Sequence, residues 1–334
     1  MIIRVTSRRA IICGLCAAAL VPVRARAQTT ASVYRIGILT PAPQLFLDRA
    51  IEALAGHGWN VGRNLIIETR YTQGDPQRAE MLARHFVEQR VHLIVTHFTG
   101  TAMAARRATS VTPIVMATSG FPVEGGLASS LARPGGNVTG VAVYASGGAL
   151  FGKYVQLLRE LVPSLRELGV FWGYAPPTYK LEQVAPAIEG LQSAAAALNI
   201  NVRFWQTGTE DDLATALKAA GSRPPDALFV TSGVIHPVPA LEAKISQFIA
   251  QRRLPTLSDG RVITAALAAY YPDTSELAAR VAHFIDRVLK GAKPADLPIE
   301  HPTRYQLSIN LKMAKAIGVT IPSSLLLRAD HVIE

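Results

Sequence analysis

The sequence predicts an α/β protein made of two similar halves, each with a parallel β-sheet. Short apolar runs rich in β-branched residues alternate with amphipathic helical segments, and this alternation starts again near residue 150. The chain has 334 residues, which favours two domains because single cores stop growing near about 250 to 300 residues. Alternating strands and helices give right-handed crossovers, and ligands then bind beyond the carboxyl ends of the strands.

The first half contains five expected strands. The first is followed by a helix with Leu47, Ile51 and Leu54 on one face. Asp75 and Pro76 have the residue types preferred at the N-cap and at the first position of a helix, so they mark the start of another helix. The strands are expected at 35–40, 65–71, 93–96, 113–117 and 138–144.

The second half repeats the pattern. Its long helix, from Val184 to Leu198, is either kinked at Pro186 or begins there. Strands are expected at 168–172, 202–206, 227–231 and 255–257, with helices at 151–161, 213–220 and 241–252. Further elements are more than two consecutive domains would need. They are strands at 267–271 and 305–309, a helix at 277–288 and a short helix from 311. The chain is therefore expected to pass back and forth between the halves.

The N-terminus has the features of an export signal. Arg4, Arg8 and Arg9 precede an apolar run at 10–23, and the small residues of 25–27 predict cleavage before Gln28. The apolar run is too short to span a bilayer core of about 30 Å. We expect a periplasmic protein, whether exported unfolded or by the twin-arginine route.

Both cysteines lie within the predicted signal. Neither Cys13 nor Cys16 follows the small residue that lipidation requires, which disfavours a lipid anchor. The mature chain is then expected to have neither a disulfide nor a thiol nucleophile. The motifs Gly-x-Ser-x-Gly and His-Glu-x-x-His are also absent from the sequence, so catalysis has no support.

Charge and composition exclude further classes. The whole chain carries +10, but five arginines and no acid lie in the predicted signal, which leaves 29 basic and 24 acidic residues. A net charge of +5 without a basic cluster disfavours nucleic acid as a partner. His92 and His97 are five positions apart on an expected strand, which places them on opposite faces, so we expect no metal site.

Several segments together resemble one family, the bacterial ABC transporter substrate-binding proteins of the type that includes tryptophan-binding lipoproteins. The segments are 125–140, 289–300, 310–318 and 328–334, and the likeness covers essentially the whole mature chain. The resemblance implies the type I periplasmic binding fold, with two Rossmann-like lobes joined by a three-segment hinge. It places 31–143 and 270–303 in the N-lobe, and 144–269 and 304–334 in the C-lobe.

The chain departs from the family pattern in two places. Phe121 precedes Pro122 and Val123 where the family commonly has Asp, and Ala265-Ala266 stand where it has a Gly pair. Loss of that carboxylate removes a plausible partner for a ligand ammonium. Phe121 would favour an apolar or aromatic ligand instead.

Site residues are expected in the loops that follow the strands. Thr99, Gly100 and Thr101 come where a strand passes into a helix, and free N–H groups there would hold a ligand carboxylate. Alternatively, these threonines only cap the helix. The other candidates are Thr40, Pro41, Phe98, Thr118, Ser119 and Phe121 in the first half, Tyr174, Ser232 and Asp259 in the second, and Tyr271, or else its neighbour Tyr270, on a crossing strand.

The preferred hypothesis is the extracytoplasmic solute-binding component of an ABC importer. It would bind an aromatic or branched amino acid or organic acid between the lobes, close on it as a monomer, and present it to an inner-membrane permease. No cofactor is expected. A periplasmic sensor that signals to a membrane kinase or chemoreceptor is the alternative, with a secreted enzyme as a third.

Overall fold

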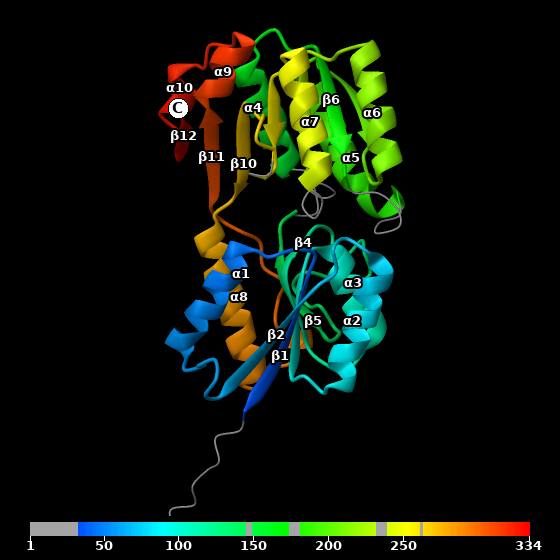
Figure 1. Cartoon of the computed structure of the whole chain (residues 1–334), viewed down its shortest axis with the longest axis vertical. Helices are drawn as coiled ribbons and strands as arrows, with labels where there is room; N and C mark the ends of the chain where they lie inside the picture. The colour runs from blue at the N-terminus through cyan, green and yellow to red at the C-terminus, as the bar shows by residue number, and fades with distance from the viewer. Residues whose placement is uncertain (1–32, 145–148, 174–180, 232–238, 261–262) are drawn as a thin grey trace, which may run out of the picture. The chain divides into compact units, whose positions relative to one another are not determined.

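A computed structural model describes residues 33–144, 149–173, 181–231, 239–260 and 263–334 (Figure 1). Residues Val33–Glu334 form one compact unit. The predicted export signal and its cleavage point lie outside the described residues. Within the described ranges, none of the helices combines the length and the apolar character needed to cross a membrane.

The first sheet has five parallel strands in the order β2-β1-β3-β4-β5. Every residue of β3 and β4 is buried, as the apolar runs predicted. The predicted strand at 138–144 is two residues shorter, because it ends at Ala142. The strands are β1 (Tyr34–Thr40), β2 (Leu65–Tyr71), β3 (Leu93–His97), β4 (Ile114–Ser119) and β5 (Val138–Ala142).

The second helix of this half begins at the signal that the sequence predicts. The Asp75 carboxylate accepts hydrogen bonds from the backbone N–H groups of Gln77 and Arg78, as expected of an N-cap. A short 3₁₀ turn ends at Gly58, which has a left-handed φ of 91°. The elements are α1 (Leu45–Ala53), η1 (Leu54–His57), α2 (Pro76–Glu88) and α3 (Thr99–Ala108).

The second sheet has seven strands in the order β12-β11-β10-β9-β8-β6-β7. Its run β7-β6-β8-β9-β10 repeats the strand order of the first sheet, which confirms the prediction of two similar halves. The strands are β6 (Glu167–Trp172), β7 (Asn201–Gln206), β8 (Ala227–Val230), β9 (Thr256–Ser258), β10 (Ala268–Pro272), β11 (Tyr305–Asn310) and β12 (His331–Ile333).

This second sheet is mixed rather than wholly parallel. β11 runs antiparallel to β10, and β12 then pairs with β11 in parallel. The predicted parallel pairing therefore holds from β7 to β10, and β11 departs from it because the chain enters β11 from the end of the sheet at which β10 leaves it. β12 and the short helix α10 (Ser323–Leu326) were not predicted from the sequence.

Six further helices of the described chain follow β5. They are α4 (Ala149–Leu161), α5 (Leu181–Ala196), α6 (Glu210–Ser222), α7 (Pro239–Arg252), α8 (Thr274–Leu289) and α9 (Leu311–Ile317), with a 3₁₀ turn η2 (Pro294–Asp296). Pro186 lies inside α5, so the alternative that a helix begins at Pro186 was wrong.

The chain passes between the two sheets three times, as the family resemblance implied. It leaves the first sheet after β5, returns from β10 to α8, and leaves again between η2 and β11. α8 lies beside α1, although the two helices are more than 200 residues apart (Figure 1). The exact residue bounds of the lobes stay a prediction.

Candidate ligand-binding site

The strand order places the first candidate residues at the point where the sheet reverses direction. In the order β2-β1-β3-β4-β5, successive connections leave on opposite sides at β1 and β3, and ligands bind at such switch points. Thr40 ends β1 and His97 ends β3, and Thr40 Oγ1 lies 3.3 Å from His97 Nδ1. Both side chains are buried, so this end of the sheet is organised by short polar contacts.

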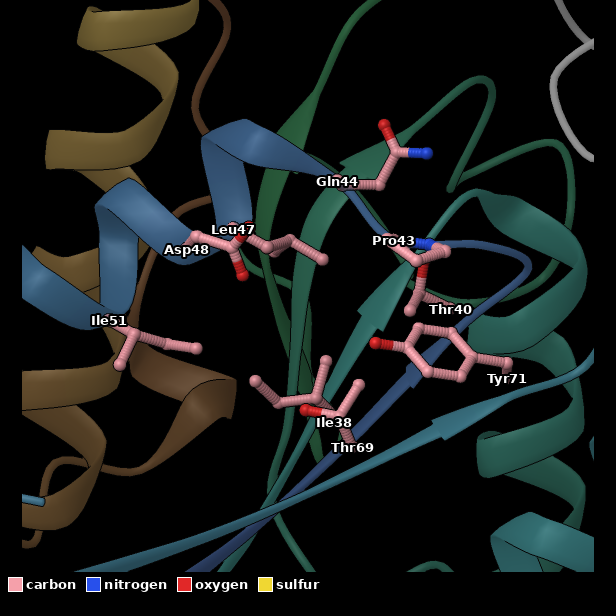
Figure 2. A pocket seen from close by; sticks show the side chains of 9 residues that line it. All are labelled: Ile38, Thr40, Pro43, Gln44, Leu47, Asp48, Ile51, Thr69 and Tyr71. Carbon is pink, nitrogen blue, oxygen red and sulfur yellow. The ribbon is translucent and has the colours of Figure 1, made fainter.

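A surface hollow opens beside Thr40, at the ends of β1 and β2 (Figure 2). Its empty volume is about 260 Å³, part of which is open solvent. The lining residues are Ile38, Thr40, Pro43, Gln44, Leu47, Asp48, Ile51, Thr69 and Tyr71. Among the predicted site residues that the structure describes, only Thr40 lines the hollow.

The loop from β3 to α3 carries the predicted carboxylate-binding segment. The N-cap of α3 is Phe98, which has a φ of 70° and makes no side-chain cap hydrogen bond. Thr101 Oγ1 donates instead to the carbonyl oxygens of His97 (2.6 Å) and Phe98 (2.9 Å). Within the described chain, the backbone N–H groups of Thr99, Gly100 and Thr101 have no partner. This helix start thus presents donors to an anion.

Thr99 joins this loop to the end of β4. Its side chain is 2% exposed, and its Oγ1 lies 2.7 Å from Ser119 Oγ and accepts from Gly120 N at 2.8 Å. The backbone extends the junction, since Phe98 N donates to Thr118 O (3.0 Å). The ends of β3 and β4 therefore form one rigid polar platform.

Aromatic rings adjoin this platform. Phe121 follows β4 and is buried, and its ring stacks on that of Tyr144 with centroids 5.3 Å apart and planes 17° apart. Tyr144 stacks in turn on Phe151, at 5.2 Å and 25°. Val143 N donates to Ser119 O (2.8 Å), which fixes the segment carrying Tyr144 to the end of β4. This wall of aromatic rings thus begins two residues after Ser119, the last hydroxyl of the platform.

The second sheet contributes a carboxylate. Asp259 follows β9 and is 6% exposed, and the hydroxyl of Tyr144 donates to its Oδ2. At the equivalent switch point of this sheet, the Thr231 hydroxyl bonds the backbone instead, donating to Phe171 O and accepting from Gly173 N. Asp259 therefore contacts the aromatic wall through Tyr144.

The remaining predicted residues are less closely connected to this site. Pro41 is buried, and its carbonyl accepts from Gln73 N. Tyr271 is buried on β10, and its neighbour Tyr270 stacks on Tyr305 at 5.2 Å. Alternation along the strand points Tyr270 and Tyr271 to opposite faces. Tyr174 and Ser232 lie outside the described residues.

The histidines of this half have separate surroundings. His92 Nδ1 accepts from Arg35 N before β3 begins, whereas the His97 ring lies against Phe98 at 3.8 Å. Over the residues that the structure describes, no group of three or more His, Cys, Asp or Glu side chains is placed to hold a metal ion.

Tyr144 is a candidate site residue that was not predicted from the sequence. It was placed inside a strand, whereas the strand ends two residues earlier. An aromatic residue just beyond a carboxyl strand end was the available signal, because loops at those ends carry ligand contacts.

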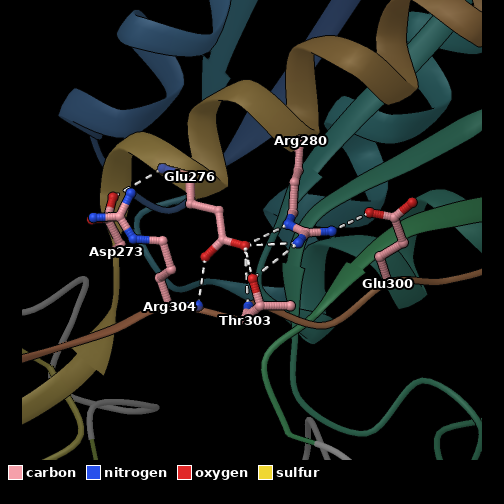
Figure 3. A network of polar contacts seen from close by, with 6 residues as sticks. All are labelled: Asp273, Glu276, Arg280, Glu300, Thr303 and Arg304. Carbon is pink, nitrogen blue, oxygen red and sulfur yellow. Dashed lines mark hydrogen bonds and ion pairs between the residues drawn. The ribbon is translucent and has the colours of Figure 1, made fainter.

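A charged network lies where two of the crossing segments meet (Figure 3). Glu276, in the first turn of α8, accepts from Thr303 Oγ1 (2.6 Å), Arg304 N (2.8 Å) and Arg280 Nε (2.9 Å). Arg280 also pairs with Glu300. Burial raises the pKa of Glu276, but hydrogen bonds from Thr303, Arg280 and the backbone outweigh it and lower the pKa to about 2. The segment before β11 is thus fixed to α8.

Comparison with known proteins agrees with this architecture. A model of the family described as ABC transporter substrate binding protein matches residues 38–333. The chain belongs to this family. Its members are binding proteins rather than enzymes, and they typically act outside the cytoplasm.

Individual members of the family and solved structures give closer comparisons. The chain is 28% identical over 296 residues to a tyrosine-binding protein of Clostridioides difficile strain R20291, covering 85% of this chain and 81% of that protein. The ABC domain of Streptococcus pneumoniae in complex with L-Trp superposes with a TM-score of 0.81 at 24% identity, covering 90% of this chain and all of that one. A conserved domain protein of Vibrio cholerae superposes with a TM-score of 0.80 at 24% identity, covering 90% of this chain and all of that one. The fold is that of the type I periplasmic binding proteins.

Proposed function

We propose that this ABC transporter substrate-binding protein carries an aromatic amino acid, or a closely related aromatic or branched acid, to an inner-membrane permease. The related proteins named above are described as binding tyrosine and L-Trp. The proposal places the mature protein in the periplasm, after cleavage before Gln28. It places the ligand where the two lobes close on it.

The observation that carries this proposal is the junction of an anion site with an aromatic wall. The N–H groups at the start of α3 suit a carboxylate, and the stacked rings of Phe121 and Tyr144 suit an aromatic side chain. Thr99 and Ser119 connect the loops that carry these two features. An aromatic amino acid has a carboxylate for the first feature and an aromatic ring for the second, joined by a short aliphatic link.

Transport needs no covalent step in this scheme. A ligand that contacts both lobes binds the closed form more tightly than the open form, and this difference shifts the equilibrium toward closure. The free energy for import comes from the partner ATPase. The site accordingly needs groups that bind and orient, as hydroxyls, N–H groups and aromatic rings do.

Isothermal titration against L-tryptophan, L-tyrosine, L-phenylalanine, L-leucine and 3-phenylpropionate tests the proposal. Thr99→Ala combined with Thr101→Ala should weaken binding of the preferred compound about tenfold, because the variant loosens the loop that aims the N–H groups. Thr109→Ala is the matched control. Its hydroxyl accepts from Val111 N and Thr112 N at the far end of α3, so affinity should stay unchanged. Failure of every compound to bind the wild-type protein would contradict the proposal.

A further inference from the structure

We propose that His97 is a positioning residue of the binding site. Together with Thr40 it fixes the turn at Phe98, and this turn aims the N–H groups at the start of α3 toward the ligand carboxylate. The inference rests on the proposed function, and it names the residues that set the geometry of the carboxylate site. It joins the buried pair at the ends of β1 and β3 to a strained residue that follows β3.

The backbone of Phe98 sets the direction in which α3 leaves β3. Its φ is 70° and its ψ is 155°, a combination that is essentially confined to glycine. A residue with a side chain keeps this conformation only where its surroundings hold it there. With an ordinary negative φ, the peptide groups that follow Phe98 would point in another direction. The strain at Phe98 therefore decides where the first N–H groups of α3 point.

Contacts to the backbone and to the ring hold Phe98 in this conformation. Its N–H donates to Thr118 O (3.0 Å), and its carbonyl oxygen accepts from Thr101 Oγ1 (2.9 Å), so both flanking peptide groups are fixed. Its ring lies against the imidazole of His97, with centroids 3.8 Å apart and planes 36° apart. The orientation of the imidazole therefore affects the turn.

The hydrogen bonds of Thr40 assign the hydrogen on the His97 ring. Thr40 Oγ1 donates its one hydrogen to Ala42 O at 2.9 Å. The same oxygen lies 3.3 Å from His97 Nδ1, where it can then only accept, so Nδ1 carries a hydrogen. His92, just before the start of β3, is the opposite case, because its Nδ1 accepts from Arg35 N (3.0 Å). When neutral, these two histidines therefore have different tautomers.

The bond to Thr40 fixes the rotation of a ring that is already enclosed. His97 is 3% exposed, and the ring of Phe46, on α1, meets it edge-on with centroids 5.1 Å apart. Loss of the bond would cost a buried nitrogen one of its partners and remove the contact that sets the plane of the imidazole. A polar contact at the end of β1 is thus transmitted through His97 to Phe98 and to the start of α3.

The test measures the preference for a carboxylate, by isothermal titration of an acid and of the alcohol in which a –CH₂OH group replaces the carboxylate. The pair is L-tryptophan with L-tryptophanol, L-tyrosine with L-tyrosinol, or the equivalent for whichever compound of the panel binds most tightly. Thr40→Val should lower affinity for the acid about fivefold and that for the alcohol less than about twofold. Thr40→Ser keeps the hydroxyl and should retain the wild-type preference.

A second variant shows whether the two residues act through one bond. His97→Phe keeps a ring but removes the donor, so its loss of preference should match that of Thr40→Val. The double variant should show no further loss, because each substitution removes the same bond.

Thr139→Val is the matched control. It removes the hydroxyl of another buried strand threonine, which lies on β5 and donates to Leu297 O (2.8 Å). The carboxylate preference of this variant should equal that of the wild type.

NMR of nitrogen-labelled imidazole rings at about pH 8 gives a readout that a merely structural role would not move. In the wild type, His97 should carry its hydrogen on Nδ1 and His92 on Nε2. In Thr40→Val, the hydrogen of His97 should no longer be confined to Nδ1, whereas the His92 signals should stay the same.

The outcomes separate this inference from the proposed function. If the wild type prefers the acid, and Thr40→Val and His97→Phe keep the whole preference, the inference is wrong and the proposed function stands. Additive losses in the double variant, a His97 hydrogen on Nε2 alone, or equal binding of acid and alcohol by the wild type would also contradict the inference. If no compound of the panel binds, the proposed function is wrong and the inference with it.

Discussion

The strand-end loops of the first sheet are held by hydrogen bonds between neutral groups, whereas the crossing segments are held by interactions between charged groups. Around Thr99 and Ser119 the contacts are between hydroxyls and backbone groups. Around Glu276 they are ion pairs and charge-assisted hydrogen bonds. The crossing segments therefore balance their own charges, whereas in the proposed function the loops present dipoles to a charge that arrives with the ligand. Stability and binding should respond to different substitutions.

The largest expected effect is on stability, at the crossing segments. Glu276→Ala should lower the free energy of unfolding by about 3 kcal/mol, because it removes the acceptor of two backbone N–H groups and of Arg280. Glu80→Ala removes more exposed ion pairs to Arg107 and Arg84 and should cost less than about 1 kcal/mol. Urea denaturation checks both. Equal losses in the two variants would contradict the contrast.

The same carboxylate predicts how stability depends on pH. Its pKa is about 2 in the folded protein against an ordinary value of 4.5. Its contribution is therefore complete above about pH 4.5 and is lost as the pH falls toward 2. Between pH 5 and 2, the free energy of unfolding of the wild type should fall by up to about 3 kcal/mol more than that of Glu276→Gln. Parallel curves for the two proteins would show that Glu276 does not titrate as described.

Substitution in the strand-end loops should affect ligand affinity more than it affects stability. Ser119→Ala removes the hydroxyl that braces Thr99 and should weaken ligand binding about threefold, with about 1 kcal/mol lost in stability. Isothermal titration and urea denaturation of the same preparation give both values. A loss of several kcal/mol in stability with unchanged affinity would make this loop a structural element, like the crossing segments.

The smallest expected effect is that of Tyr305→Phe. The hydroxyl joins the start of β11 to Val143, and its loss should cost about 1 kcal/mol of unfolding free energy. Affinity should not change. A marked change in affinity would show that this bond between two crossing segments controls the site as well as the fold.

Much of the fold could be predicted because its signals are local. Apolar runs marked the strands, and Asp75 with Pro76 marked the start of α2. The antiparallel pairing of β11 and the contacts of Glu276 with Thr303 and Arg304 could not be predicted in this way, because the residues that create them lie 27 or more positions apart in the chain. Thr99 was placed by its position after β3, whereas Tyr144 was missed because the expected strand at 138–144 includes it, and β5 ends at Ala142.

A crystal structure of the protein with L-tryptophan or L-tyrosine tests the central claim most directly. We expect the ligand carboxylate within hydrogen-bonding distance of the N–H groups of Gly100 and Thr101, and the ligand ring against Phe121 and Tyr144. A carboxylate bound elsewhere, with the start of α3 facing only water, would contradict the account.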